Sequence, residues 1–285
     1  MNSDNKINSQ LKNYLIKHEI ISNEMIWYTQ TGGRTNKVWR LKGEKDLICK
    51  LYLQTKINPL FDNCPDAEYA CLVWLNGSDI APKPYKYLKT PFGEVLLYDY
   101  IKGHTWSHDV ETVSELLNRI RKHKYPKGLR FLSNLPSDIK QTGFEIINKL
   151  NADHRNELMN ICPDVLISDI ESVLLHTDVV PGNLILGKEG LRLIDWQCPA
   201  VGDPIVDIMM FLSPGMHEIY GAGKLSVKDF ETFLMNLTPK LRSRYNIIGP
   251  LYHWRLAAYC FWKAEQGFIE YEKAALAEID LLKMI

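Results

Sequence analysis

Residues 174–197 read LLHTDVVPGNLILGKEGLRLIDWQ, and this stretch decides the fold expected of the whole chain. Two short apolar runs, 184–186 and 191–194, flank the sequence Gly-Lys-Glu-Gly, which is typical of a β-hairpin with a glycine-bounded turn. Folding the hairpin places Asn183, which precedes the first strand, beside Asp195, which follows the second. The polar side chains of this apolar stretch are therefore predicted to gather at one end of a hairpin.

The residues at this end suit the binding of a hydrated cation and a hydroxyl group. Carboxylate and amide oxygens are ligands that Mg²⁺ prefers, so Asn183 and Asp195 form a candidate metal pair. Asp178, five residues before Asn183, adds a carboxylate that can accept a proton or orient a hydroxyl. His176 is interpreted as a brace of the loop backbone, because the two acids already serve the proton chemistry. The competing interpretation is a hairpin whose acids only cap loops.

The spacing H-x-D-x-x-x-x-N, followed by an Asp after a short hairpin, matches the catalytic loop and metal-binding Asp of the protein-kinase template. That template also needs a glycine-rich loop over the phosphates, a cation on a strand and an acid that holds the cation. The candidates, in chain order, are Gly32, Gly33 and Asn36 in the loop, Lys50 and Glu68. Taken singly, Lys50 is equally compatible with a surface lysine and Glu68 with a solvated acid at a helix start. Their order along the chain favours a nucleotide site.

Composition sets limits on the class of protein. The chain has 285 residues, 46% of them hydrophobic, which is enough for a large core or two packed lobes. Lysine plus arginine equals aspartate plus glutamate at 34 each, so neither nucleic acid nor an anionic membrane surface is an expected partner. The N-terminus is polar and no apolar run is long enough for a membrane span, so we expect a cytoplasmic protein. The six cysteines are scattered, which predicts free thiols rather than disulfides or zinc ligands. Composition does not indicate an oligomeric state.

The pattern of apolar residues changes near Gly103. Before it, residues 25–53 and 83–101 suit an antiparallel sheet, with helices expected over 8–19 and 65–75. After it, helices are expected over 109–123, 137–154, 164–173, 203–213, 227–237 and 250–283. The predicted class is α+β with two lobes, a smaller β-rich nucleotide-binding lobe over residues 1–101 and a larger, mostly helical catalytic and substrate-binding lobe over residues 102–285.

These features together resemble the aminoglycoside phosphotransferase and choline kinase family, kinase-like enzymes that act on small molecules. The resembling segments are TGGRTNKVWRL, Lys50, AEYACLVWL, EVLLYDYIKG, LLHTDVVPGNLIL, LRLIDWQ and VGDPIVDIMMFL, between residues 31 and 212. Thr177 departs from the Gly or Asn that typically follows the His in this family. The resemblance implies a bilobal protein-kinase-like fold.

The resemblance also implies a role for each matching residue. Asp178 is implied as the catalytic base, Asn183 and Asp195 as Mg²⁺ ligands, and Lys50 with Glu68 as the clamp on the phosphates of ATP. The backbone around Asp99 and Ile101 is implied to meet the adenine ring, and GTP is not excluded as the donor because backbone atoms would read the ring. Asp203 is implied to help hold the catalytic loop; from the residues alone, Asp203 before Pro204 is also a helix N-cap.

The acceptor in this family binds mainly to the second lobe, where the chain is rich in aromatic residues. Trp254, Tyr259 and Trp262 can form part of a cage for an ammonium group by cation–π attraction, although aromatic residues at helical spacing more often belong to a core. The expected acceptor is the hydroxyl of a small molecule that can carry an amine or quaternary ammonium group, such as choline or ethanolamine. The alternatives are an aminoglycoside antibiotic as acceptor, a catalytically silent nucleotide-binding protein and a metal-dependent hydrolase.

Overall fold

The computed structural model describes residues 3–30, 35–53, 58–221 and 223–284. The first part of the chain forms an antiparallel sheet with strand order β1-β2-β3-β5-β4. Its strands are β1 (Ile26–Thr29), β2 (Lys37–Lys42), β3 (Leu47–Leu51), β4 (Pro84–Thr90) and β5 (Gly93–Asp99). Helix α1 (Ser3–Lys17) packs on one face of this sheet, and helix α2 (Pro65–Trp74) packs on the other.

The central strand β3 is buried along its whole length because both faces of the sheet are covered. Cys49 belongs to the apolar cluster under α1, while Ile48 belongs to the cluster on the opposite face, with α2. Since side chains alternate along a strand, Lys50 points to the same side as Ile48. The strand thus directs a lysine toward α2 and the rest of the molecule instead of toward solvent.

The second part of the chain is mostly helical and contains two small sheets. One sheet has the order β10-β9-β6 and the other β7-β11-β8. The strands are β6 (Gly103–Thr105), β7 (Arg130–Phe131), β8 (Val173–Leu175), β9 (Leu184–Gly187), β10 (Gly190–Leu193) and β11 (Ala200–Gly202). The helices are α3 (Val110–Lys122), α4 (Pro136–Ile147), α5 (Ala152–Asn160), α6 (Ile205–Leu212), α7 (Pro214–Ile219), α8 (Val227–Met235), α9 (Pro239–Glu265) and α10 (Glu270–Leu282).

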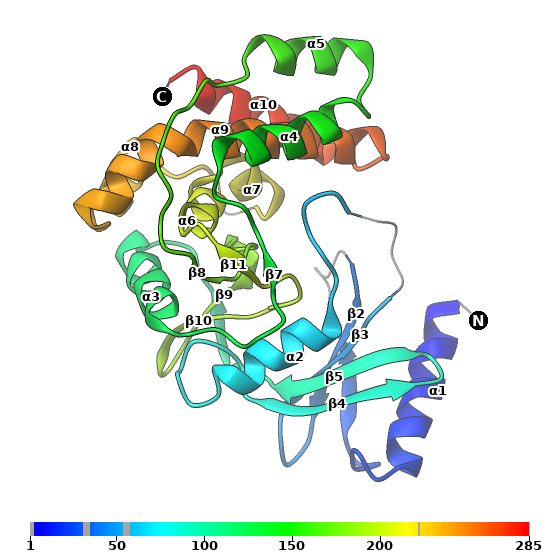
Figure 1. Cartoon of the computed structure of the whole chain (residues 1–285). Coiled ribbons are helices and arrows are strands. Elements are labelled where there is room, and N and C mark those ends of the chain that lie inside the picture. The colour runs from blue at the N-terminus through cyan, green and yellow to red at the C-terminus, as the bar shows by residue number, and fades with distance from the viewer. Residues whose placement is uncertain (1–2, 31–34, 54–57, 222, 285) are drawn as a thin grey trace.

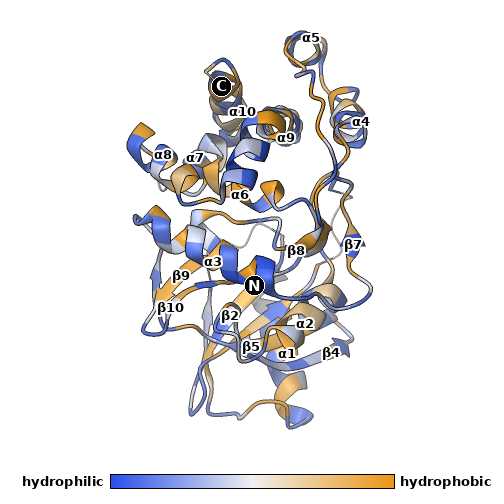
Figure 2. Ribbon diagram, turned by 60° about the vertical axis from the view of Figure 1, so that its left-hand side comes forward, coloured by the Kyte–Doolittle hydropathy of each residue, from blue (hydrophilic) through white to orange (hydrophobic). Residues whose placement is uncertain are grey.

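The long helix α9 organises the second part, since α4, α6 and α10 all pack against it. Figure 1 shows α4, α9 and α10 together at one end of the molecule and the sheet of β2 to β5 with α1 at the other. Figure 2 shows the same separation from a direction turned by 60°. The small sheets and α6 lie between the two ends. Among the described residues, no helix has the length and apolar character to span a membrane.

The predicted α+β class is confirmed, and most predicted elements are present. The helix expected over 164–173 is wrong, because residues 164–172 are irregular and 173–175 form β8. The helix expected over 137–154 is two helices, α4 and α5, with a break near Asn151, whose side chain caps α5. The helix expected over 250–283 begins earlier, at Pro239, and is interrupted after Glu265, so it is α9 followed by α10. Pro250, where the helix was expected to begin, lies inside α9.

Candidate active site

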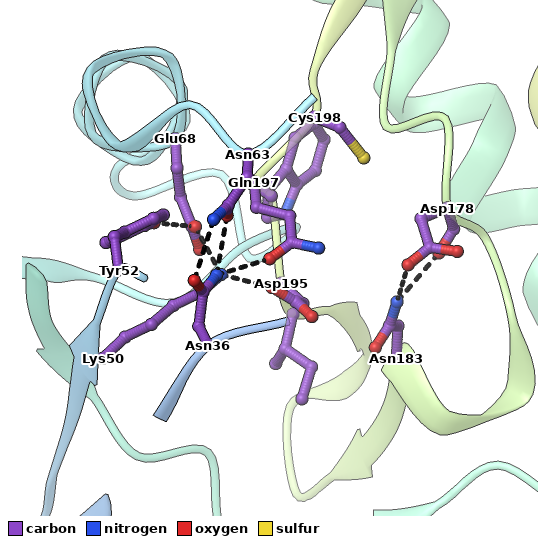
Figure 3. A network of polar contacts seen from close by, with 12 residues as sticks. Asn36, Lys50, Tyr52, Asn63, Glu68, Asp178, Asn183, Asp195, Gln197 and Cys198 are labelled. Carbon is purple, nitrogen blue, oxygen red and sulfur yellow. Dashed lines mark hydrogen bonds and ion pairs between the residues drawn. The ribbon is translucent and has the colours of Figure 1, made fainter. Parts of the chain in front are cut away.

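Lys50 lies at the centre of a buried ionic network that joins the two parts of the chain. Its ammonium donates to Glu68 Oε2 at 2.6 Å and also pairs with Asp195, while the Tyr52 hydroxyl donates to the same Glu68 oxygen. Figure 3 shows these side chains converging from β3, α2 and the segment after β10. Burial alone lowers the pKa of the Lys50 ammonium, but the charges of Asp195 and Glu68 outweigh it and raise that pKa above its ordinary value. Lys50 is therefore a fixed positive charge.

The loop between β8 and β9 carries Asp178, and Asp207 of α6 binds its backbone. The carboxylate of Asp207 accepts the backbone N–H of His176 at 3.0 Å and that of Thr177 at 2.7 Å. Thr177 has a φ of 68°, an uncommon conformation for a β-branched residue. Its hydroxyl donates to the Cys198 carbonyl at 2.7 Å. The loop is thus tied to α6 and to the bend at Cys198, before β11.

His176 fixes the same loop from inside. Its imidazole is fully buried. Nδ1 accepts the N–H of Asp178 at 3.2 Å, and Nε2 donates to the Ile194 carbonyl at 3.0 Å. Burial lowers the pKa of His176 to about 4, so the ring is neutral near pH 7, as an acceptor at Nδ1 requires. The ring thus bridges the loop that carries Asp178 and the end of the hairpin.

The hairpin of β9 and β10 brings Asn183 and Asp195 together. The N–H of Ile194 donates to the Asn183 carbonyl at 2.9 Å, which joins the two residues across the open end. The side-chain amide of Asn183 donates at 3.0 Å to both the carbonyl and the carboxylate of Asp178. Burial, and then the charge of Asp195, raise the pKa of Asp178 to about 7, although the Asn183 hydrogen bond acts in the opposite direction. Asp178 can therefore take up a proton near neutral pH.

The aromatic residues of α9 are divided between the site and the core. Tyr259 lines the same cavity as Asp178, Asn183 and Asp195. Trp254 is fully buried elsewhere, where its indole N–H donates to the Leu158 carbonyl at 2.8 Å and its ring packs on Phe144. Trp262 lies beside Tyr259, with ring centroids 5.9 Å apart. The structure thus brings one of the three predicted aromatic residues into the cavity wall and a second next to it.

The remaining predicted residues lie in the first part of the chain or at the start of α6. Gly32 and Gly33 lie outside the described residues. Asn36 is buried, and its side chain forms hydrogen bonds with Asn63 and Gln197. Asp99 is the last residue of β5, and its N–H donates to the Lys83 carbonyl at 2.9 Å. Ile101 follows two residues later. Asp203 accepts the N–H of Ile205 at 3.0 Å and pairs with Arg244. Asp207 is thus the aspartate that contacts the loop carrying Asp178, while Asp203 contacts the first residue of α6 and Arg244.

The model of the phosphotransferase enzyme family (APH) matches residues 30–222, which include Lys50, Asp178 and Asp195. This chain belongs to that family. No curated protein sequence matches it.

Solved structures share the fold of this phosphotransferase at low sequence identity. A choline/ethanolamine kinase family protein from Mesorhizobium loti superimposes with a TM-score of 0.68 at 13% identity, covering 98% of this chain and 94% of that one. The choline kinase LicA from Streptococcus pneumoniae gives 0.61 at 19% identity, covering 95% and 98%. Spectinomycin phosphotransferase APH(9)-Ia, in complex with ADP and spectinomycin, gives 0.60 at 14% identity, covering 96% and 92%. The kinase-like fold is therefore shared over nearly the whole chain.

The donor set of this phosphotransferase fits Mg²⁺ that also takes ligands from a nucleotide. The amide nitrogen of Asn183 is directed at Asp178, which leaves its oxygen as the atom available to a cation, and the side chain of Asp195 is 31% exposed. Within the described ranges, no three His, Cys, Asp or Glu side chains gather closely enough to hold a metal by themselves. One carboxylate and one amide suit Mg²⁺, because Mg²⁺ commonly keeps waters and binds substrate phosphates.

Several residues of the cavity were not singled out from the sequence. They are Asn58, Phe61, Met216, Tyr220, Lys263 and Tyr271. Asn58 Nδ2 donates to the Tyr259 hydroxyl at 3.0 Å, and the ring of Phe61 meets that of Tyr259 edge on at 5.0 Å. Tyr220 packs on the catalytic loop at Gly182, where a Cβ atom would lie only 2.6 Å from the tyrosine ring. These residues come from four separate segments, so no local sequence pattern could have grouped them.

Proposed function

We propose that this phosphotransferase is an ATP- and Mg²⁺-dependent kinase that transfers the γ-phosphoryl group to a hydroxyl of a small molecule. The observation that carries the proposal is the convergence of a fixed ammonium, Lys50, with the Asp195 carboxylate and the Asn183–Asp178 pair around one cavity. Phosphoryl transfer needs mainly positioning and neutralisation of charge, which these groups can supply. A metal-dependent hydrolase would need no acceptor pocket beyond water.

Each side chain has a role in this proposal. Asp178 orients the acceptor hydroxyl and takes its proton, as its raised pKa suits. Asn183 and Asp195 hold Mg²⁺, which when bound neutralises charge on the phosphates. Lys50, held by Glu68, contacts the α- and β-phosphates. The backbone near Asp99 and Ile101 receives the adenine ring. GTP as an alternative donor is tested alongside ATP.

The acceptor we propose is a small amino alcohol such as choline or ethanolamine. The proposal rests on the side chains that line the cavity around Asp178. Its wall includes the rings of Phe61, Tyr220, Tyr259 and Tyr271, and Asp178 adds negative charge at one end. Aromatic faces and a carboxylate both attract an ammonium group. The similarity of fold to a choline kinase supports this acceptor, and the similarity to spectinomycin phosphotransferase makes an aminoglycoside the alternative.

A cytoplasmic location is part of the proposal. The six cysteines are free thiols in the structure, and ATP as donor fits the same compartment.

The experiment is transfer of label from [γ-³²P]ATP and from [γ-³²P]GTP to a panel of acceptors: choline, ethanolamine, thiamine, sugars and aminoglycosides. We expect label on an amino alcohol in the presence of Mg²⁺ and none with the Asp178→Asn variant. Transfer to aminoglycosides alone would replace the proposed acceptor. Release of phosphate from ATP without labelling of any acceptor would indicate a hydrolase, and binding of nucleotide without turnover would indicate a silent protein.

A further inference from the structure

Three side-chain amides form a compact cluster beside the ionic network, and each comes from a different segment. Asn36 Nδ2 donates to Asn63 Oδ1 at 2.7 Å and to Gln197 Oε1 at 2.9 Å. Asn36 Oδ1 accepts the Asn63 amide at 2.9 Å and the backbone N–H of Leu53 at 3.1 Å. A carboxamide has two donors and two acceptor sites, so all four of Asn36 are used. Figure 3 shows Asn36, Asn63 and Gln197 meeting next to Asp195.

The cluster joins the same elements that supply the ionic network. Leu53 follows β3, which carries Lys50, and Asn63 lies just before α2, which carries Glu68. Gln197 lies two residues after Asp195, and its backbone carbonyl also accepts the N–H of Cys64 at 3.0 Å. Gln197 is therefore fastened to the first part of the chain by its side chain and by its main chain.

Asp195 depends on such fastening. Its φ of 65° is a left-handed conformation that non-glycine residues adopt only when neighbouring contacts hold them. On its N-terminal side, Ile194 is fixed by Asn183 and His176. On its C-terminal side, Gln197 supplies the corresponding anchor through its contacts with Asn36 and Cys64.

We propose that Asn36, Asn63 and Gln197 are positioning residues that keep Asp195 in place to hold the Mg²⁺ of a metal–nucleotide complex. Asn36 thereby acts through its amide partners, at the edge of the cavity, instead of only as part of a loop over phosphates. The inference rests on the proposed kinase function, since it assigns the cluster to that same site. Because Asp195 acts on the nucleotide through the metal, loss of the cluster weakens binding of Mg-ADP more than binding of ADP alone.

The test is calorimetric titration of the whole protein with ADP, with Mg²⁺ and with EDTA. Gln197→Met keeps the volume of the side chain and removes the hydrogen-bond acceptor, and Asn36→Ala removes the centre of the cluster. The loss of one buried hydrogen bond predicts a Kd for Mg-ADP raised about tenfold in Gln197→Met, with the Kd measured in EDTA changed less than about twofold. Gln197 is only half-buried, so this variant remains informative if Asn36→Ala does not fold.

Asn134→Ala is the matched control, because Asn134 is as buried as Asn36 at 8% exposure and donates to the Ile170 carbonyl at 2.9 Å, away from the cavity. We expect this variant to lose stability without a change in either Kd. Unchanged Mg-ADP binding in Gln197→Met, or equal weakening with and without Mg²⁺, would overturn the inference while leaving the kinase proposal in place. Failure of the wild-type protein to bind Mg-ADP would instead overturn the kinase proposal itself.

Discussion

Among the residues that the structure describes, Arg244 and Asp203 form the most deeply buried arginine–carboxylate pair, and replacing Arg244 by methionine breaks it. The Arg244 guanidinium donates to Asp203 Oδ2 from Nε at 2.8 Å and lies 2.7 Å from it at Nη2, and it also donates to the Ser168 carbonyl at 2.6 Å. The side chains are 5% and 0% exposed. Without the guanidinium, Asp203 keeps the N–H of Ile205 as a partner but remains a buried charge. Removing one member of such a pair costs about 3–5 kcal/mol, and we expect the free energy of unfolding to fall by that amount.

Urea denaturation followed by circular dichroism measures the change, with the slope against denaturant compared to confirm a single transition. Lys89→Met is the control, because Lys89 pairs with Glu94 at the surface and an exposed pair is worth less than about 1 kcal/mol. Adding Asp203→Asn to Arg244→Met removes the unpaired charge and should recover at least about 1 kcal/mol. A loss below about 1 kcal/mol in Arg244→Met, or no recovery in the double variant, would refute the reasoning.

Three further predictions concern the chemistry. Asp178→Asn should lower kcat by about 10²–10⁴ while the Kd for Mg-ADP stays within about twofold, as single-turnover kinetics and calorimetry can measure; near-normal turnover would contradict a role as base. Asp178 must be ionised to accept a proton, and its pKa is raised to about 7. We therefore expect kcat/KM for the acceptor to fall as the pH drops through this pKa. Bound Mg²⁺ favours the carboxylate, so the midpoint should lie at or below about pH 7. A flat profile between about pH 5 and 8 would contradict this. Glu278→Ala removes the acceptor of the Ser213 hydroxyl and the Gly215 N–H at the start of α7, and also the buried partner of His253. Tyr220, which directly follows α7, packs on the loop that carries Asp178. KM for the acceptor should therefore rise about tenfold, with KM for ATP unchanged.

The hairpin and its polar end could be predicted because the information is local. Two apolar runs with a glycine-bounded turn determine the pairing of β9 with β10, and the register then fixes Asn183 near Asp195. Lys50 could be singled out because a charge inside an apolar strand is costly without a partner, but only its place in the order of the candidates distinguished it from a surface lysine. The break between α4 and α5, and the irregular segment 164–172, were not predictable, because tertiary packing and a single capping residue decide them.

The residues on the acceptor side of the cavity could not be predicted from the sequence. Phe61, Tyr220 and Tyr271 become neighbours only after the two parts of the chain pack together, and each has an ordinary sequence context. Trp254 and Tyr259 illustrate the same limit within one helix. They are five residues apart on α9, yet Trp254 packs on α4 and Tyr259 faces the cavity, and only the neighbouring helices determine which is which. Amphipathic periodicity fails for α9 because it is buried on several sides.

The two unusual backbone conformations of the site have a common physical consequence. Thr177, just before Asp178, and Asp195 both have positive φ, and such residues cost about 1–3 kcal/mol each unless surrounding contacts hold them. The contacts are present in both cases: Asp207 accepts two N–H groups of the catalytic loop, and His176 bridges from that loop to Ile194. Both are formed entirely by this chain. Contacts within the chain thus hold the carboxylates to which we assign the proton and metal chemistry, Asp178 and Asp195. In the proposed kinase, binding energy need not be used to order them, and phosphoryl transfer benefits most from groups that are already in place.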